Sequence, residues 1–240
     1  MTLSPALLDD GPWSLSVSVS ADHDRRTLAA DLAAVMATAP TRLDGTAAVQ
    51  VWIEEVRDGD DEAVAHLVTP YRDLWQLRRP LPADPSGLVT RGFDPGRDVQ
   101  AWVDVNNRSF AWHPEQSGQT PDRVAATMAE PWFDADGFRI LEIDGRMAGF
   151  CWTKVHADHE PPMGEIFVIG LDPDFHGRGL GGPMTLAGLE WLSAQGITLA
   201  NLYVESDNDP ANATYERLGF SHHATNRAYT SDPAAVPGAA

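Results

Sequence analysis

The sequence predicts an α/β fold in which helices pack against one mixed sheet. Between residues 85 and 230, strand-like and helix-like segments follow each other in the order β-α-α-β-β-β-α-β-α-β. One of them, GEIFVIGL at 164–171, is a continuous apolar run, which is typical of a central strand buried on both faces. With 43% hydrophobic and 22% charged residues, the 240-residue chain has the composition of a globular protein.

Each element of this segment is predicted by its periodicity and its end signals. The Thr-Pro pair at 120–121 indicates the start of a helix, and the Asp-Gly pair at 144–145 is a hairpin signal between two strands. In chain order the predicted elements are strand 87–93, helices 98–110 and 120–130, two strands within 138–156, strand 164–171, helix 181–196, strand 199–206, helix 209–219 and strand 223–229.

The first 81 residues predict a shorter unit that repeats the second half of this domain. WSLSVSVSADHDRRTLAADLAAVM indicates a strand, a loop and a helix, and AVQVWIEEVRDGDDEAVAHL indicates a strand, an acidic turn and a helix. A last strand follows in YRDLWQLRRPL. We therefore expect a partial, degenerate repeat at 1–81, a linker at 82–87, a full domain at 88–230 and a disordered tail at 231–240.

The charge of the chain argues against nucleic acid as a partner. Thirty-five acidic and seventeen basic residues give a formal net charge of −18, and such a surface repels phosphate backbones. No apolar run is long enough to span a bilayer, and the N-terminal MTLSPALLDDGPW lacks the basic residues that open a signal peptide. We expect a cytoplasmic protein that binds neither nucleic acid nor a membrane, as a monomer or weak dimer.

The single cysteine, Cys151, excludes an internal disulfide and any multi-cysteine metal site. Its neighbours in sequence indicate a small residue of a strand. His113, His156 and His159 raise the question of a metal, but no set of partners stands at ligand spacing, and we predict no metal site.

The stretch HGRGLGGPM, residues 176–184, has the G-x-G-x-x-G spacing of dinucleotide-binding loops. Glu205 favours that interpretation, because it ends the next strand at nearly the distance expected of a ribose-binding acid. The interpretation fails because DPDFH separates the preceding strand from the first glycine, and because only 58 residues follow Gly182. No Gly-Lys-Ser/Thr closes a P-loop either. What remains is a backbone anion site at the start of a helix, or a glycine-rich turn that binds nothing.

Several segments resemble one enzyme family. LDPDFHGRGLGGPM is similar to the Q/R-x-x-G-x-G/A loop of the GNAT acetyltransferases, with His176 where Gln or Arg is usual. VNNRSFAWHPEQ, GFCWTKVH, GEIFVIGLDP and LYVESDNDPANATYERLGF resemble the mycothiol synthases within that superfamily, over residues 102–230. These enzymes have two tandem GNAT units and acetylate the cysteine amine of Cys-GlcN-Ins (desacetylmycothiol), the final step of mycothiol biosynthesis. The resemblance implies a GNAT fold, acetyl-CoA as acetyl donor and a catalytic domain at 88–230.

The resemblance also implies a cofactor site. In the superfamily the cofactor arm lies beside the central strand, and the glycine loop binds its pyrophosphate. The positions of this chain that match are Ile169, Gly170, Leu171, His176, Gly177, Arg178, Gly179, Leu180, Gly181, Gly182, Asn208, Ala211 and Asn212. Asn208 can equally be a plain helix cap.

Two residues match the catalytic positions of the family. Glu165 corresponds to the glutamate that contacts the substrate amine and accepts its proton, directly or through water. Tyr215 corresponds to the tyrosine that protonates the departing thiolate. Without the resemblance, Glu165 would be an exposed acid and Tyr215 an aromatic that packs its helix. Glu115, Lys154 and Tyr203, together with Glu165, match acceptor-binding positions.

The first unit lacks the early portion that supplies part of the acceptor pocket in the family. No acceptor-binding residue can therefore be transferred to 1–84, and the acceptor amine stays open. Beside the acetylation of Cys-GlcN-Ins, two alternatives remain. One is a relative that acetylates another small-molecule amine, and the other is a non-catalytic module that binds acyl-CoA.

Overall fold

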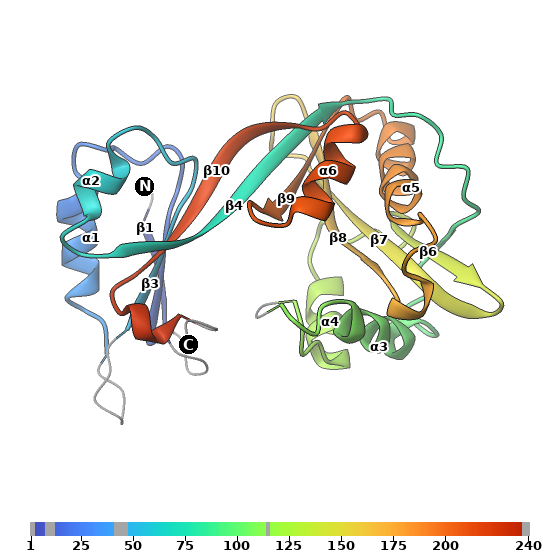
Figure 1. The fold of residues 1–240 in the computed structure, drawn as a ribbon, viewed down its shortest axis with the longest axis horizontal. Helices are drawn as coiled ribbons and strands as arrows, with labels where there is room; N and C mark the ends of the chain where they lie inside the picture. Colours follow the sequence, from blue (N-terminus) through green and yellow to red (C-terminus); the bar gives the residue numbers. More distant parts are fainter. Residues whose placement is uncertain (1–2, 8–12, 41–47, 114–115, 237–240) are drawn as a thin grey trace. The chain divides into compact units, whose positions relative to one another are not determined.

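The computed structural model describes residues 3–7, 13–40, 48–113 and 116–236. The chain forms two compact units (Figure 1). Unit 1 consists of Met1–Gln76, Val204–Asn208 and His223–Ala240, and unit 2 of Leu77–Tyr203 and Asp209–His222. Contacts in space define these two units. The predicted division into 1–81 and 88–230 rests on a sequence repeat, and this division stays a prediction.

The described strands and helices alternate much as the sequence predicts (Figure 1). The strands are β1 Leu3–Leu7, β2 Leu15–Val19, β3 Val49–Ile53, β4 Thr69–Pro80, β5 Arg91–Gly92, β6 Phe138–Ile143, β7 Arg146–His156, β8 Met163–Leu171, β9 Leu199–Glu205 and β10 Ser221–Thr230. The helices are α1 Leu28–Met36, α2 Asp60–Val64, α3 Val99–Ser109, α4 Pro121–Met128, α5 Gly181–Ala194 and α6 Asp209–Arg217, with short 3₁₀ turns at Pro173–Phe175 and Pro233–Ala235.

The strands belong to one mixed sheet, so the predicted α/β class is confirmed. Their hydrogen-bonded order is β1-β2-β3-β10-β4-β9-β8-β7-β6-β5. Strands β6, β7 and β8 are antiparallel neighbours, whereas β8 and β9 run parallel. Among the described residues, no helix is both long and apolar enough to cross a membrane.

Unit 1 has a core of its own between its strands and the helices α1 and α2. Val17 of β2, Val51 of β3 and Leu28 of α1 are fully buried in it. The loop between β2 and α1, which has no glycine, is held by Arg25. Its guanidinium donates to the Asp60 carboxylate at 3.1 Å and to the Glu54 carbonyl oxygen at 2.8 Å.

Residues 231–236 follow β10 and are hydrogen-bonded to unit 1. The Ser231 amide donates to the Val49 carbonyl at 3.0 Å, and the Ser231 hydroxyl accepts from the Val49 amide at 2.8 Å. A 3₁₀ turn follows at Pro233–Ala235, capped by the Asp232 side chain. The expected disorder over 231–240 stays a prediction, and residues 237–240 lie outside the described part.

Unit 2 is layered around β7 and β8. Figure 1 shows α3 and α4 on one side of β6, β7 and β8, and α5 on the other. On the α3 side, Trp102 packs edge-on against Trp152, with ring centroids 5.7 Å apart, and Phe138 stacks on Trp152 at 4.3 Å. These aromatic residues fill the space between helix and sheet and fix the β7 surface.

Two details of the predicted elements are wrong. The predicted strand 87–93 shrinks to β5, because only Arg91 and Gly92 pair with β6, opposite Ile140 and Arg139. Strand β1 was not predicted, although it pairs with β2 along its whole length. Its sequence, LSPAL, contains a proline and does not alternate.

Helix α5 approaches β7 so closely that only glycine fits at position 188. A Cβ on Gly188 would overlap the Sγ of Cys151 and lie 2.9 Å from Cδ1 of Ile166. Gly181 is the first residue of the same helix, and a Cβ there would have no atom within 4 Å.

We predict that Gly188→Ala lowers the free energy of unfolding by about 1–3 kcal/mol, the usual cost of overpacking a core. Gly181→Ala is the matched control and should change it by less than about 1 kcal/mol. Urea denaturation measures both variants. Equal stability of the two variants would contradict the close packing of α5 on β7.

Candidate active site

Strand β8 changes neighbours along its length. It pairs with β7 from Met163 to Leu171, but with β9 only over Gly164–Ile166, opposite Ala200–Leu202. Beyond Ile166 the β9-facing edge of β8 has no pairing with β9. The predicted cofactor-binding residues Ile169, Gly170 and Leu171 lie on this stretch.

Side chains around this stretch set its conformation. A Cβ on Gly170 would lie 2.8 Å from the Phe150 ring, so the backbone can approach that ring only with glycine. The Leu171 carbonyl accepts the Ser109 hydroxyl at 2.8 Å and contacts Nε2 of His176 at 3.0 Å. His176 therefore ties the start of the glycine loop back to the end of β8.

The glycine loop presents free backbone donors at the start of α5. Among the described residues, the N–H groups of 177–182 donate to no backbone or side-chain acceptor. Gly177 and Gly179 have φ angles of 74° and 70°, and a Cβ on either would meet nothing within 4 Å. Unpaired N–H groups at a helix N-terminus are the usual donors of an anion-binding cradle.

A buried aspartate holds the entry to this loop. Asp172, 1% exposed, accepts a hydrogen bond from Arg108 of α3, and its Oδ1 caps the Asp174 amide at 3.1 Å. Arg146 of β7 donates to Asp174 at 2.5 Å, and this hydrogen bond lowers the pKa of the Asp174 carboxyl. The sequence analysis did not single out Asp172, although an aspartate before a proline is a turn signal.

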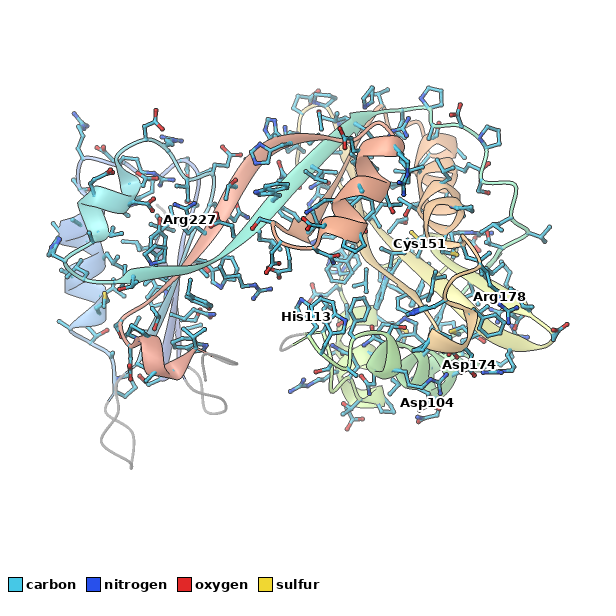
Figure 2. All side chains as sticks on the ribbon, in the orientation of Figure 1. Asp104, His113, Cys151, Asp174, Arg178 and Arg227 are labelled. Atoms are coloured by element: carbon cyan, nitrogen blue, oxygen red, sulfur yellow. The ribbon has the colours of Figure 1, made fainter. Side chains whose placement is uncertain are left out.

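Arg178 lies against the same turn. Its guanidinium is 4.7 Å from the centroid of the Phe175 ring, and its Nη2 is 3.5 Å from the Asp174 carbonyl oxygen. Figure 2 shows Arg178 and Asp174 at the same end of unit 2. Arg178 therefore brings a positive charge to the loop although the chain as a whole is acidic.

Helix α6 lies beside the start of α5, because a Cβ on Gly182 would be 3.9 Å from Cγ2 of Thr214. This contact brings the glycine loop and the helix of Tyr215 together. The Tyr215 ring packs edge-on against Phe220 at 5.8 Å. Its hydroxyl makes no hydrogen bond within the described residues, and burial raises the pKa of Tyr215 above its usual value.

The remaining predicted cofactor residues lie around the start of α6. Ala211 and Asn212 are half-buried in its first turns. Asn208 belongs to unit 1, where its amide donates to the Glu205 carbonyl at 3.1 Å.

Glu165 is buried rather than exposed. It is 8% exposed near the start of β8, and its register partners are Lys154 on β7 and Asn201 on β9. Its Oε2 lies 2.6 Å from Nε2 of His156. Lys154 points its Nζ at the Trp132 ring, 4.8 Å from the centroid. Glu165 and Lys154 thus stand side by side, as acceptor-binding residues would.

Two further residues, Tyr203 and Glu115, are predicted to bind the acceptor, and the structure describes only Tyr203. Tyr203 of β9 is 39% exposed. Glu115 lies outside the described residues. Sequence reasoning missed Asn201, which is 1% exposed and whose amide atoms have no hydrogen-bond partner in the described part of the chain.

Cys151 is a buried residue of β7. Burial raises the pKa of the Cys151 thiol to about 12, so the reactive thiolate does not form near neutral pH. Figure 2 shows Cys151 within the sheet of unit 2. Within the ranges that the structure describes, no group of three or more His, Cys, Asp or Glu side chains could hold a metal ion.

The fold is that of a known class of transferases. Residues 100–220 match the model of the Acetyltransferase (GNAT) family, and the chain belongs to this family. The expected resemblance and the expected GNAT fold are thereby confirmed.

Within the family, the chain is similar to mycothiol acetyltransferases. It is 43% identical to that of Actinosynnema mirum over 221 residues, which cover 88% of this chain and 72% of the relative. The protein of Thermomonospora curvata is 46% identical and that of Streptomyces coelicolor 45%, over 71% and 72% of this chain. The chain spans only 59% and 60% of the length of these two relatives.

Solved structures agree on the fold. A GCN5-related N-acetyltransferase from Sphaerobacter thermophilus superposes with a TM-score of 0.69 at 21% identity, over 95% of this chain and 76% of that one. A tandem GNAT protein from the clavulanic acid biosynthesis pathway gives 0.64 at 19% identity, over 96% and 79%. At these identities the similarity concerns the fold alone.

Proposed function

We propose that this chain transfers the acetyl group of acetyl-CoA to the cysteine amine of Cys-GlcN-Ins, the last step of mycothiol biosynthesis, in the cytoplasm. The observation that carries the proposal is the arrangement along β8: a buried glutamate at its start, an edge without β9 pairing in its middle and a cradle of N–H groups after its end. The choice of acceptor is supported by the mycothiol acetyltransferases at 43–46% identity.

The donor side is suited to a pyrophosphate. The N–H groups of 177–182 would bind its oxygens, and the dipole of α5 would add to that attraction. Open space at Gly177 and Gly179 leaves room for such a group. Acetyl-CoA, when bound, supplies the acetyl thioester. Because the donors are main-chain groups, this site needs no net positive charge.

On the acceptor side, Glu165 serves as the base. Oε2 is occupied by His156, whereas Oε1 has no hydrogen-bond partner among the described residues and is not one of the buried unpaired atoms. An amine attacks a thioester only when it is neutral, so Oε1 accepts a proton from the substrate ammonium group before or during attack. Lys154 and Tyr203 would bind hydroxyl groups of the sugar-inositol.

Tyr215 serves as the acid for the leaving sulfur. Its hydroxyl is free of protein partners within the described residues, and its raised pKa keeps it protonated through neutral pH. A proton held on Oη can therefore pass to the thiolate as the thioester bond breaks.

A second candidate is the acetylation of another small-molecule amine. It is supported by the match to the GNAT family, because that match concerns acetyl transfer and does not specify the acceptor. Both candidates use the same donor site and the same two residues, Glu165 and Tyr215.

We expect the purified protein to convert acetyl-CoA and Cys-GlcN-Ins into free CoA and the N-acetylated product, detected by chromatography with mass spectrometry. Acetylation of another small-molecule amine from a panel, without acetylation of Cys-GlcN-Ins, would favour the second candidate. Binding of acetyl-CoA without turnover of any amine would overturn both and indicate a non-catalytic module.

Gly179→Ala should weaken the binding of CoA about tenfold or more. Alanine avoids the φ of 70°, at a cost of about 1–2 kcal/mol, and leaving that conformation turns the N–H groups away. Gly196→Ala is the matched control, because Gly196 has a φ of 80° and equal open space beyond the other end of α5. Calorimetric titration should show normal CoA affinity for the control, and similar losses of affinity in both variants would count against the cradle.

Tyr215→Phe should lower kcat about 100-fold, the usual contribution of a positioned acid, with little change in CoA affinity. The hydroxyl makes no hydrogen bond within the described residues, so the variant should unfold at nearly the wild-type urea concentration. Steady-state kinetics and CoA titration test this. A variant that loses affinity but keeps kcat would show that Tyr215 only packs the helix.

A further inference from the structure

His156 is the one described residue that hydrogen-bonds the Glu165 side chain. It ends β7, and its register partner on β8 is Met163, two residues before Glu165. On adjacent antiparallel strands this is a diagonal pair on one face, within reach of long side chains. The atoms that meet are Nε2 of His156 and Oε2 of Glu165, 2.6 Å apart.

The distance requires a hydrogen between these two atoms, because an imidazole lone pair and a carboxylate oxygen repel each other. With Glu165 ionised, as the proposed base must be, this hydrogen is on Nε2, which donates to Oε2. Nδ1 of His156 has no partner among the described residues and is not one of their buried unpaired atoms, so it faces water. The side chain of His156 is 28% exposed and that of Glu165 only 10%.

The neighbouring cation does not compete for the carboxylate. Lys154 is the register partner of Glu165, yet its Nζ lies over the rings of Trp132 and Phe167, at 4.8 Å and 5.9 Å from their centroids. On the β9 side the register partner is Asn201, whose amide makes no hydrogen bond in the described part of the chain. Orientation of the buried carboxylate therefore depends on His156.

We propose that His156 is a positioning residue for the base of the acetyl transfer. By holding Oε2, its Nε2–H turns Oε1 toward the acceptor amine and offsets part of the cost of burying the carboxylate. In the transfer step the ammonium N–H bond breaks and an Oε1–H bond forms, while His156 keeps its own proton. This inference rests on the proposed function, because it assigns a role around the same glutamate.

His156→Ala should lower kcat for the acceptor about 10- to 100-fold, the range expected for a misplaced catalytic group, with unchanged CoA affinity. His156→Gln should recover most of that loss, because the glutamine amide nitrogen stands close to the position of Nε2 and donates a hydrogen bond. His159→Ala is the control. His159 is exposed in the loop between β7 and β8, and its ring contacts the Pro161 carbonyl oxygen. This control should keep wild-type kcat.

A double-mutant cycle separates positioning from a general structural role. In the Glu165→Gln background, His156→Ala should cause no further loss of kcat, because the group that it positions is gone. Wild-type kcat in His156→Ala, an equal loss in the Ala and Gln variants, or additive losses in the cycle would each overturn the inference while leaving the proposed function intact. If the wild-type protein turns over no amine, the proposed function fails and this inference fails with it.

Discussion

The functional part of the molecule depends on the way β8 pairs with its neighbours. Along β7 it is paired from end to end, which anchors it in the sheet, whereas β9 accompanies it only from Gly164 to Ile166. Three consequences follow from this one strand. Glu165 is buried where both neighbours are present, the backbone edge beyond Ile166 is left without β9, and the glycine loop begins where the strand ends. The proposed donor and acceptor sites therefore lie along a single strand of the sheet, which favours precise placement.

Local backbone geometry explains how a chain with a net charge of −18 can have a site for an anionic cofactor. The donors are main-chain N–H groups at the start of α5, and the arginines around them are partly neutralised by Asp172 and Asp174. The attraction for phosphate therefore comes from direction and proximity more than from net charge. An acidic surface elsewhere leaves this site unchanged and discourages the binding of nucleic acids.

Much of the fold could be predicted from the sequence, because the elements of 98–230 carry strong local signals. Apolar continuity marked β8, the Asp-Gly pair marked the β6–β7 hairpin, and glycines marked the loop before α5. The sequence predicted β1 and the short β5 poorly, because these strands are defined by their pairing with β2 and β6 and not by local sequence. The anion site proposed for the glycine loop could also be predicted from the sequence, since its donors lie in consecutive residues.

The side-chain partners of the site could not be predicted in the same way. The pairing of β7 with β8 sets the register that brings His156 to Glu165, and this register shifts at Trp152, where Phe167 of β8 is skipped. The alternation of the sequence alone does not show that register. The pairing of Arg108 with Asp172 joins positions 64 residues apart, with no local signal for it. Such contacts arise from register and packing, and a single sequence contains neither.

The central claim is that the backbone N–H groups of 177–182 bind the pyrophosphate of the cofactor, and NMR tests it directly. In a titration of ¹⁵N-labelled protein with CoA, the account predicts large shifts of the amide signals of Gly177, Gly179, Gly181 and Gly182. The amide of Gly196, beyond the other end of α5, should stay in place. Saturable binding of CoA that leaves the four loop amides unmoved would contradict it.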